Sequence, residues 1–172
     1  MTAAGQQPNT IRKAGAAKPR YCIGIDPGHQ TGLAIWDRAE RQFLMIETTT
    51  ILRAQTRILQ FVAENTLRES PQSGKVRDQP GDCTLYVENP NLRTWFGKKG
   101  SEALQGAGSV KRDYSVWEEF SELTGLPIVA VHPKNVMSLP GEKGAGHFAA
   151  LTRHGQRTSV HAREAAIMVF GL

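Results

Sequence analysis

The chain has 172 residues, of which 40% are hydrophobic and 22% charged, and these values are typical of one globular domain with or without a tail. No uncharged apolar run approaches the ~20 residues that span a bilayer, and no apolar signal-peptide core follows Met1, which argues against a membrane or secreted protein. The net charge of +5, from 21 basic and 16 acidic residues, is small enough that any nucleic-acid footprint must be a local patch.

The two cysteines, Cys22 and Cys83, lie far apart in the sequence and belong to no CxxC motif or Cys/His cluster. This spacing argues against a zinc site and against a disulfide framework. It predicts buried, reduced thiols, which are typical of a cytoplasmic protein.

Residues 1–19 are rich in Ala, Gly, Gln and Lys and hold almost no large apolar side chains. Because they cannot bury a core, they predict a disordered basic tail before a single domain over residues 20–172. The first 20 residues carry four basic side chains and no acidic ones, which leaves the other 152 with 17 basic against 16 acidic. Two interpretations of this tail stay open: a basic arm that follows a phosphate backbone, and an organelle-targeting peptide. The tail lacks the apolar helical face that is typical of a targeting peptide.

Three short apolar runs follow the tail, and the turn residues between them predict an antiparallel meander. The first run, Tyr21–Asp26, ends on an acid and is followed by Pro27 and Gly28. Residues 33–36 and 43–46 predict the second and third strands. A helix over 51–68 is then indicated by a stripe of residues at helical spacing, namely Ile51, Ala54, Ile58, Leu59, Val62 and Asn65.

The second half of the chain predicts two more strands and two more helices. A polar loop over 69–82 leads to a strand over 83–87, which again ends on an acid, Glu88. A helix over 113–124 is indicated by the apolar stripe of Val116, Trp117, Phe120 and Leu123. A fifth strand over 127–132, a flexible glycine-rich stretch over 134–145 and a last helix over 159–170 follow. This order predicts an α/β fold with a mixed five-stranded sheet flanked by helices.

Polar side chains lie at the ends of two predicted strands and on the last helix. Asp26 and Glu88 close the first and fourth strands. His161 and Glu164 are three residues apart, so they project from one helix face and can converge with the acids if that face lies over the sheet. Carboxylates are ligands for Mg²⁺, and an imidazole suits Mn²⁺ better. Two such ions about 3.5–4 Å apart can activate a water and stabilise the leaving oxygen in phosphodiester cleavage.

Each of these residues has a plainer interpretation when it is taken singly. An acid after a strand is commonly a turn residue, and a helical histidine is commonly a partly buried residue with an ordinary partner. The small neighbours Ala162, Ala165 and Ala166 favour the metal site, because they let the helix approach the sheet closely. A polar pair on such a helix needs partners, since an unpaired buried charge is costly.

Five motifs resemble those of the RuvC-type Holliday junction resolvases. Residues 23–32 (IGIDPGHQTG) are similar to the opening strand and turn of that family, and residues 85–90 (LYVENP) to its second acidic strand. Residues 104–110 (LQGAGSV) resemble the small-residue helix that follows, and residues 131–136 (VHPKNV) a later strand end. Residues 160–166 (VHAREAA) resemble the closing acidic helix.

The resemblance implies a ribonuclease-H-like fold and metal-dependent nicking of branched DNA, with Mg²⁺ as cofactor and Mn²⁺ able to substitute. It places catalysis and metal ligation on Asp26, Glu88, His161 and Glu164. Because family members dimerise on four-way junctions, we expect a homodimer that binds such DNA, no membrane partner, and a cytoplasmic or nucleoid-associated location.

The sequence departs from the family pattern at three places. The turn after Asp26 is one residue shorter than in bacterial RuvC, which favours a divergent phage or mobile-element branch. Glu164 stands where Asp is usual, so its carboxylate reaches one methylene further. A family lysine near the penultimate helix could correspond to Lys143 or to His147. Two alternatives stay open: a YqgF-like RNA-processing nuclease, and a junction-binding domain of the same fold without catalysis.

A basic stretch after Glu88 predicts DNA contacts. Residues 91–112 hold five basic side chains against Glu102, and this density could neutralise phosphates or belong to a solvated loop. Trp95 and Phe96 could stack on unpaired bases, worth on the order of 1–3 kcal/mol per base, or pack into the core or a dimer interface. The predicted DNA-binding residues are Arg93, Trp95, Phe96, Lys98, Lys99, Lys111, Arg112, Lys134, Lys143 and His147.

Overall fold

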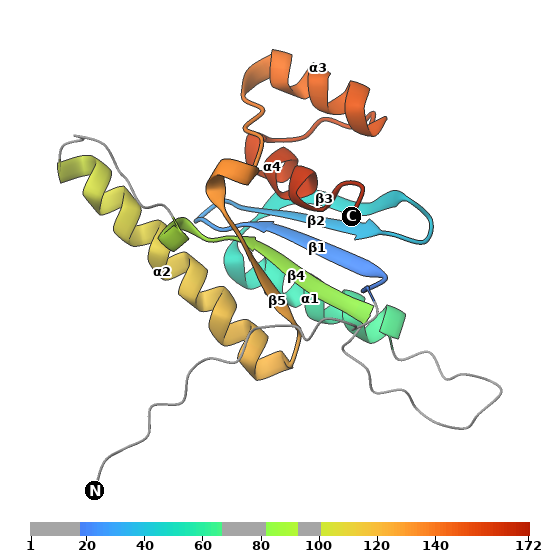
Figure 1. Ribbon diagram of the computed structural model, residues 1–172, viewed down its shortest axis with the longest axis horizontal. Helices are drawn as coiled ribbons and strands as arrows, with labels where there is room; N and C mark the ends of the chain where they lie inside the picture. Colours follow the sequence, from blue (N-terminus) through green and yellow to red (C-terminus); the bar gives the residue numbers. More distant parts are fainter. Residues whose placement is uncertain (1–17, 67–81, 93–100) are drawn as a thin grey trace, which may run out of the picture.

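The computed structural model describes residues 18–66, 82–92 and 101–172, and its centre is a five-stranded sheet (Figure 1). The strands are β1 (Tyr21–Asp26), β2 (Thr31–Asp37), β3 (Gln42–Thr49), β4 (Cys83–Glu88) and β5 (Ile128–Val131). They lie in the order β3-β2-β1-β4-β5. The first three pair antiparallel, whereas β4 runs parallel to β1 and β5 runs parallel to β4, so the sheet is mixed.

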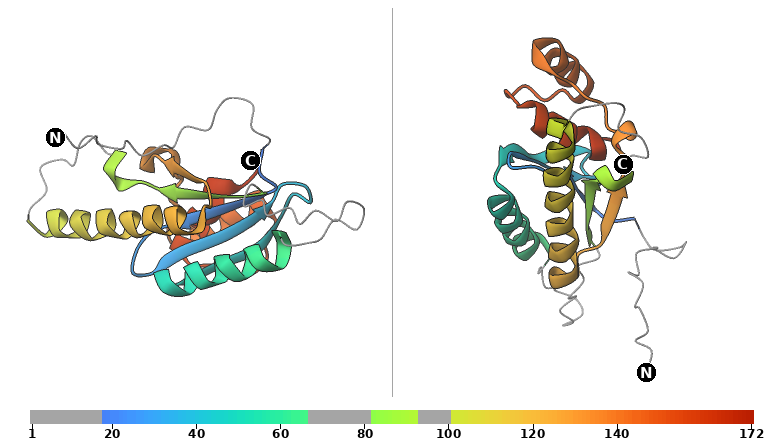
Figure 2. Two further views of the ribbon diagram at one scale, coloured as in Figure 1. Left: turned by 90° about the horizontal axis from the view of Figure 1, so that it is seen from below. Right: turned by 90° about the vertical axis from the view of Figure 1, so that its left-hand side faces the viewer.

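Helices cover both faces of the sheet and give the molecule its layers (Figures 1 and 2). In the described residues the helices are α1 (Ile51–Thr66), α2 (Ser101–Thr124), α3 (Gly141–Thr152) and α4 (Val160–Val169), with the short 3-10 helices η2 (Pro90–Leu92) and η3 (Pro133–Asn135). α1 and α2 pack on one face and α4 on the other, while α3 lies on the far side of α4 from the sheet. None of the helices in the described ranges combines the length and the apolar character needed to cross a membrane.

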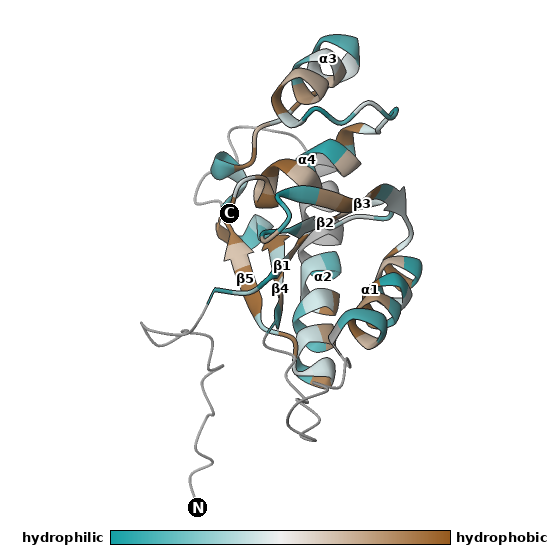
Figure 3. Ribbon diagram, turned by 90° about the vertical axis from the view of Figure 1, so that its right-hand side faces the viewer, coloured by the Kyte–Doolittle hydropathy of each residue, from teal (hydrophilic) through white to brown (hydrophobic). Residues whose placement is uncertain are grey.

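Alternate residues of each strand supply the cores on the two faces, because successive side chains of a strand point in opposite directions. Ile23 and Ile25 of β1 lie in the cluster that α1 and α2 cover, beside the fully buried Trp117. Cys22 and Trp36 lie in the other cluster, which α3 and α4 cover. In Figure 3 α1 carries teal and brown residues side by side, as a helix with one buried face does.

The predicted α/β fold and its mixed five-stranded sheet are confirmed. Cys22 and Cys83 are free and fully buried, as predicted. The predicted stripes of the two long helices contain errors, because Leu59 is 46% exposed and Leu123 is 80% exposed. Each helix contacts the sheet through a narrower band, and Phe61 of α1 is buried in place of Leu59.

The prediction of a flexible glycine-rich stretch over 134–145 is wrong, because this stretch contains η3 and the start of α3 at Gly141. Leu139 and Phe148, 6% and 1% exposed, anchor the region in the cluster beneath α4. Burial of two large apolar side chains stabilises by several kcal/mol, which outweighs the helix-propensity cost of about 1 kcal/mol per glycine. In the same half of the chain, α2 begins earlier than predicted, at Ser101.

Candidate functional site

The sheet brings Asp26 and Glu88 to neighbouring positions. β1 and β4 are parallel, and their register pairs Ile25 with Val87, so the next residue of each strand is one of the two acids. Ile25 and Val87 are fully buried, and Asp26 itself is 9% exposed. The two acids therefore occupy neighbouring positions at the carboxyl ends of two central strands.

Helix α4 crosses this part of the sheet at very short range, because glycines in β1 and β2 leave room for its backbone. A Cβ at Gly32 would lie 2.0 Å from the carbonyl oxygen of His161, and a Cβ at Gly24 would lie 2.0 Å from that of Ala165. On the helix side, Ala162 and Ala165 are 1% and 0% exposed. The small residues on both sides set the height of α4 above the strands.

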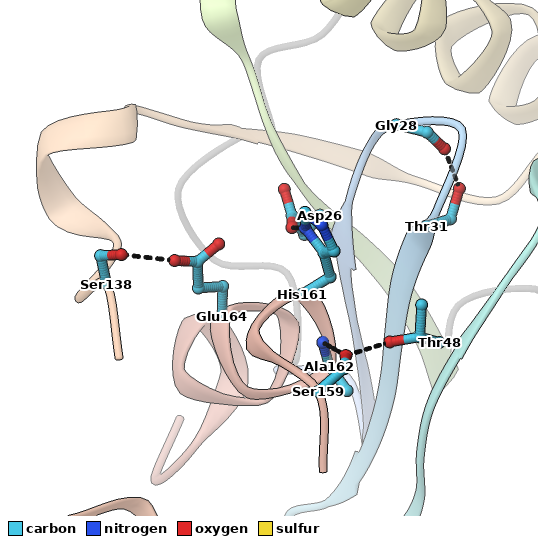
Figure 4. A network of polar contacts seen from close by, with 9 residues as sticks. All are labelled: Asp26, Gly28, Thr31, Thr48, Ser138, Ser159, His161, Ala162 and Glu164. Atoms are coloured by element: carbon cyan, nitrogen blue, oxygen red, sulfur yellow. Dashed lines mark hydrogen bonds and ion pairs between the residues drawn. The ribbon is translucent and has the colours of Figure 1, made fainter. Parts of the chain in front are cut away.

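A hydroxyl cap fixes where α4 begins. The Ser159 hydroxyl accepts a hydrogen bond of 3.1 Å from the backbone N–H of Ala162, as an N-cap residue does. The Thr48 hydroxyl of β3 forms a hydrogen bond with the Ser159 hydroxyl in turn (Figure 4). Because this cap sets the first helical turn, it also sets the place of His161 over the sheet.

Asp26, His161 and Glu164 form a cluster at this place (Figure 4). Each offers one ligand atom, and these atoms all lie within 4.8 Å of one another. His161 Nδ1 lies 2.7 Å from Asp26 Oδ2. The Ser138 hydroxyl donates a hydrogen bond of 2.7 Å to Glu164 Oε1. We call the three residues Asp26, His161 and Glu164 the α4–β1 cluster.

The electrostatics of Asp26 reflect its surroundings. The pKa of Asp26 is raised to about 6: burial is the largest cause, the hydrogen bond and charge of His161 oppose it, and the negative charges of Glu88 and Glu164 add to the rise. Glu88 is thus near enough to raise the pKa of Asp26. It is not among the three residues whose ligand atoms lie within 4.8 Å of one another. A buried carboxylate beside other carboxylates is a place where a positive charge is stabilising.

The donor set of the α4–β1 cluster fits a divalent cation. Carboxylates are ligands for both Mg²⁺ and Mn²⁺, and the imidazole is tolerable to Mg²⁺ and better suited to Mn²⁺. Ligands on opposite sides of one Mg²⁺ stand about 4.2 Å apart, because each lies about 2.1 Å from the ion. The ligand atoms here, all within 4.8 Å of one another, can meet that spacing with small side-chain movements.

The predicted DNA-binding residues lie partly outside the described residues. Those outside are Arg93, Trp95, Phe96, Lys98 and Lys99, together with the side chain of Lys111. Lys134 on η3 is exposed, and so are Lys143 and His147, which lie one turn apart on α3. Arg112 on α2 is also exposed, 4.0 Å from Asp113. The choice between Lys143 and His147 as an auxiliary residue stays open.

The sequence predictions did not include the residues that support the cluster. Gly24 and Gly32 carry a readable signal, because a glycine inside a strand commonly marks a close approach of another backbone. Ser138 carries no such signal, since it lies between predicted elements and meets Glu164 only in the folded chain.

No family model and no curated protein matches this chain. Among solved structures, it is similar to RuvC of T. thermophilus in complex with a Holliday junction substrate, with a TM-score of 0.51 and 17% sequence identity. The similarity covers 87% of this chain and 90% of that chain. At this identity the likeness concerns the fold: a ribonuclease-H-like α/β domain whose mixed five-stranded sheet is flanked by helices.

Proposed function

We propose that this protein is a metal-dependent, structure-selective endonuclease that cleaves branched DNA, with the four-way junction as substrate. The observation that carries the proposal is the α4–β1 cluster, which lies at the end of β1 beside Glu88. The fold shared with a RuvC that was solved with a Holliday junction substrate supports the choice of substrate.

In this proposal Asp26, Glu88, His161 and Glu164 hold Mg²⁺, or Mn²⁺ in its place. Asp26 contributes a buried carboxylate on a rigid strand, and His161 and Glu164 close the site from the helix above it. A bound divalent cation supplies Lewis-acid stabilisation of a phosphate oxygen and lowers the pKa of a water. The short distance between α4 and the sheet limits the movement of the helix backbone that carries both ligands, which favours a preorganised site.

Basic side chains would position the DNA without reading its sequence. Lys134, Lys143 and His147 are exposed in the segment between β5 and α4, and Arg112 is exposed on α2. We further propose that the protein acts as a homodimer, so that two strands of a junction are cut. We also propose that it works in the cytoplasm, where DNA is accessible. Its origin in a phage or mobile-element branch stays a prediction.

The test is nicking of a labelled, immobile four-way junction beside a linear duplex of the same sequence and a structured RNA. Each substrate is incubated with Mg²⁺, with Mn²⁺ and with EDTA. We expect metal-dependent nicks near the exchange point of the junction and little cleavage of the duplex. Cleavage of the RNA alone would assign the protein to RNA processing, and tight junction binding without cleavage in either metal would make it a non-catalytic binding domain.

A further inference from the structure

Side-chain hydrogen bonds join the first part of α4 to the segment between η3 and α3. Ser138, in that segment, donates its hydroxyl hydrogen bond to Glu164 Oε1 at 2.7 Å. Arg163, the residue before Glu164 on α4, donates hydrogen bonds from Nε and Nη2 to the carbonyl oxygen of Leu139, at 3.0 and 2.8 Å. Adjacent residues of the helix therefore bind adjacent residues of the segment.

The contacts of Arg163 are buried. Arg163 is 3% exposed, and its Nη1 also donates to the carbonyl oxygen of Thr158 at 2.5 Å. A guanidinium presents its donors in a planar fork, so two bonds to one carbonyl fix the direction of that peptide as well as its distance. Leu139 is 6% exposed within the cluster beneath α4, and the backbone of Gly144 packs directly against it.

These contacts hold the backbone at Leu139, directly after Ser138. Glu164 is different, because its side chain has several rotatable bonds and is half-buried. A flexible carboxylate that must act as a ligand gains from a partner that holds one of its oxygens. Partners of this kind orient metal ligands in proteins, and their removal commonly weakens metal affinity roughly 10- to 100-fold.

We propose that Ser138 is a positioning residue that holds Glu164 Oε1 and thereby presents the other carboxylate oxygen of Glu164 to the divalent cation. The proposal rests on the proposed function, since it assumes that the α4–β1 cluster binds a metal. It also assigns a role to the longer side chain of Glu164, which reaches Ser138 as well as the cluster.

The experiment measures Mn²⁺ affinity, by the electron paramagnetic resonance signal of free Mn²⁺, for the full chain and four variants: Ser138→Ala, Ser138→Thr, Glu164→Asp and the double variant Ser138→Ala/Glu164→Asp. We expect Ser138→Ala to raise the Kd for Mn²⁺ about tenfold. Ser138→Thr keeps a hydroxyl at this position and should restore most of the affinity. In the Glu164→Asp background the shorter side chain no longer reaches Ser138, so Ser138→Ala should add less than a twofold change.

A matched control separates this role from the mere loss of a hydroxyl. Thr56→Ala removes an exposed hydroxyl hydrogen bond to the Leu52 carbonyl on α1, on the opposite face of the sheet, and should leave the Mn²⁺ affinity unchanged. The thermal unfolding midpoint of Ser138→Ala should match that of the unaltered chain, because Ser138 is exposed.

The outcomes distinguish this proposal from the proposed function. An unaltered chain that binds no Mn²⁺ would overturn the proposed function and this inference with it. Mn²⁺ binding that Ser138→Ala leaves within twofold of the unaltered chain would overturn the inference alone. Equal losses in Ser138→Ala and Ser138→Thr, or an undiminished loss in the Glu164→Asp background, would also overturn it.

Discussion

A single methyl group at Gly32 should separate helix α4 from the sheet. The Cβ of Gly32→Ala would lie 2.0 Å from the carbonyl oxygen of His161 and 2.4 Å from its carbonyl carbon. Gly32 lies on β2 directly opposite Asp26 of β1, so the strand cannot withdraw without breaking this pairing. The helix must move instead, and it carries His161 with it.

The size of the effect follows from these distances. Carbon atoms in contact normally stand about 3.5–4 Å apart, so the first turn of α4 must recede by more than about 1 Å. Overpacking of a closely packed site costs about 1–3 kcal/mol of stability. A displacement of about 1 Å in a group that takes part in chemistry can cost about 100-fold in rate.

The assay pairs urea unfolding with junction nicking for Gly32→Ala and for a control, Gly146→Ala. Gly146 lies within α3, and apart from its chain neighbours and the adjacent helix backbone no atom lies within 4 Å of its added Cβ, so alanine there should stabilise by about 0.5–1 kcal/mol. We expect Gly32→Ala to lose stability and most of its nicking rate, and Gly146→Ala to gain slightly in stability and keep its nicking rate. Unchanged stability and rate in Gly32→Ala would refute the reasoning that α4 rests directly on the strands.

Three further predictions concern other parts of the molecule. Burial raises the pKa of Asp37, but hydrogen bonds from Arg20 and from two backbone amides outweigh it and lower the pKa below its usual value. The charged form of Asp37 therefore stabilises the fold above about pH 4, and this stability is lost as the pH falls through the lowered pKa. In urea unfolding, Asp37→Asn should lower the free energy of unfolding by about 1–2 kcal/mol at neutral pH. The difference in stability between Asp37→Asn and the unaltered chain should vanish in acid. Burial raises the pKa of the Cys83 thiol to about 12. A thiol reagent at about pH 8 should therefore label Cys83 only after denaturant is added. Rapid labelling of Cys83 in the native protein would contradict the placement of this residue in the core. Replacing the exposed Lys134 and Lys143 with Gln should weaken junction binding. The slope of the logarithm of the binding constant against the logarithm of the salt concentration should fall by about 1 for each phosphate that is no longer neutralised. An unchanged slope would show that these lysines do not contact the DNA.

The strands and the acids at their ends were predictable because local signals determine them. An apolar run that ends on an acid and a turn, as at Asp26, needs little tertiary information to be recognised. The small residues of α4 likewise indicated a close approach to the sheet, and the buried Ala162 and Ala165 bear this out.

The supporting contacts could not be predicted, because they depend on where distant segments meet. Ser138 reaches Glu164 across 26 residues of chain, and Arg163 is buried against carbonyl groups of a segment whose glycines predicted flexibility. The exposure of Leu123 shows the same limit, since a helical stripe fixes which residues share a face but not how wide the contact with the sheet is.

The most direct test of the proposed nuclease site compares the unaltered chain with Asp26→Asn in two measurements on one labelled four-way junction: binding in Ca²⁺ or EDTA, and nicking in Mg²⁺. Glu119→Gln, which neutralises an exposed acid on α2, serves as the charge-matched control. We predict that Asp26→Asn binds the junction within a few-fold of the unaltered chain and loses nicking, while Glu119→Gln keeps both. Nicking by Asp26→Asn at the unaltered rate would contradict the assignment of catalysis to the α4–β1 cluster.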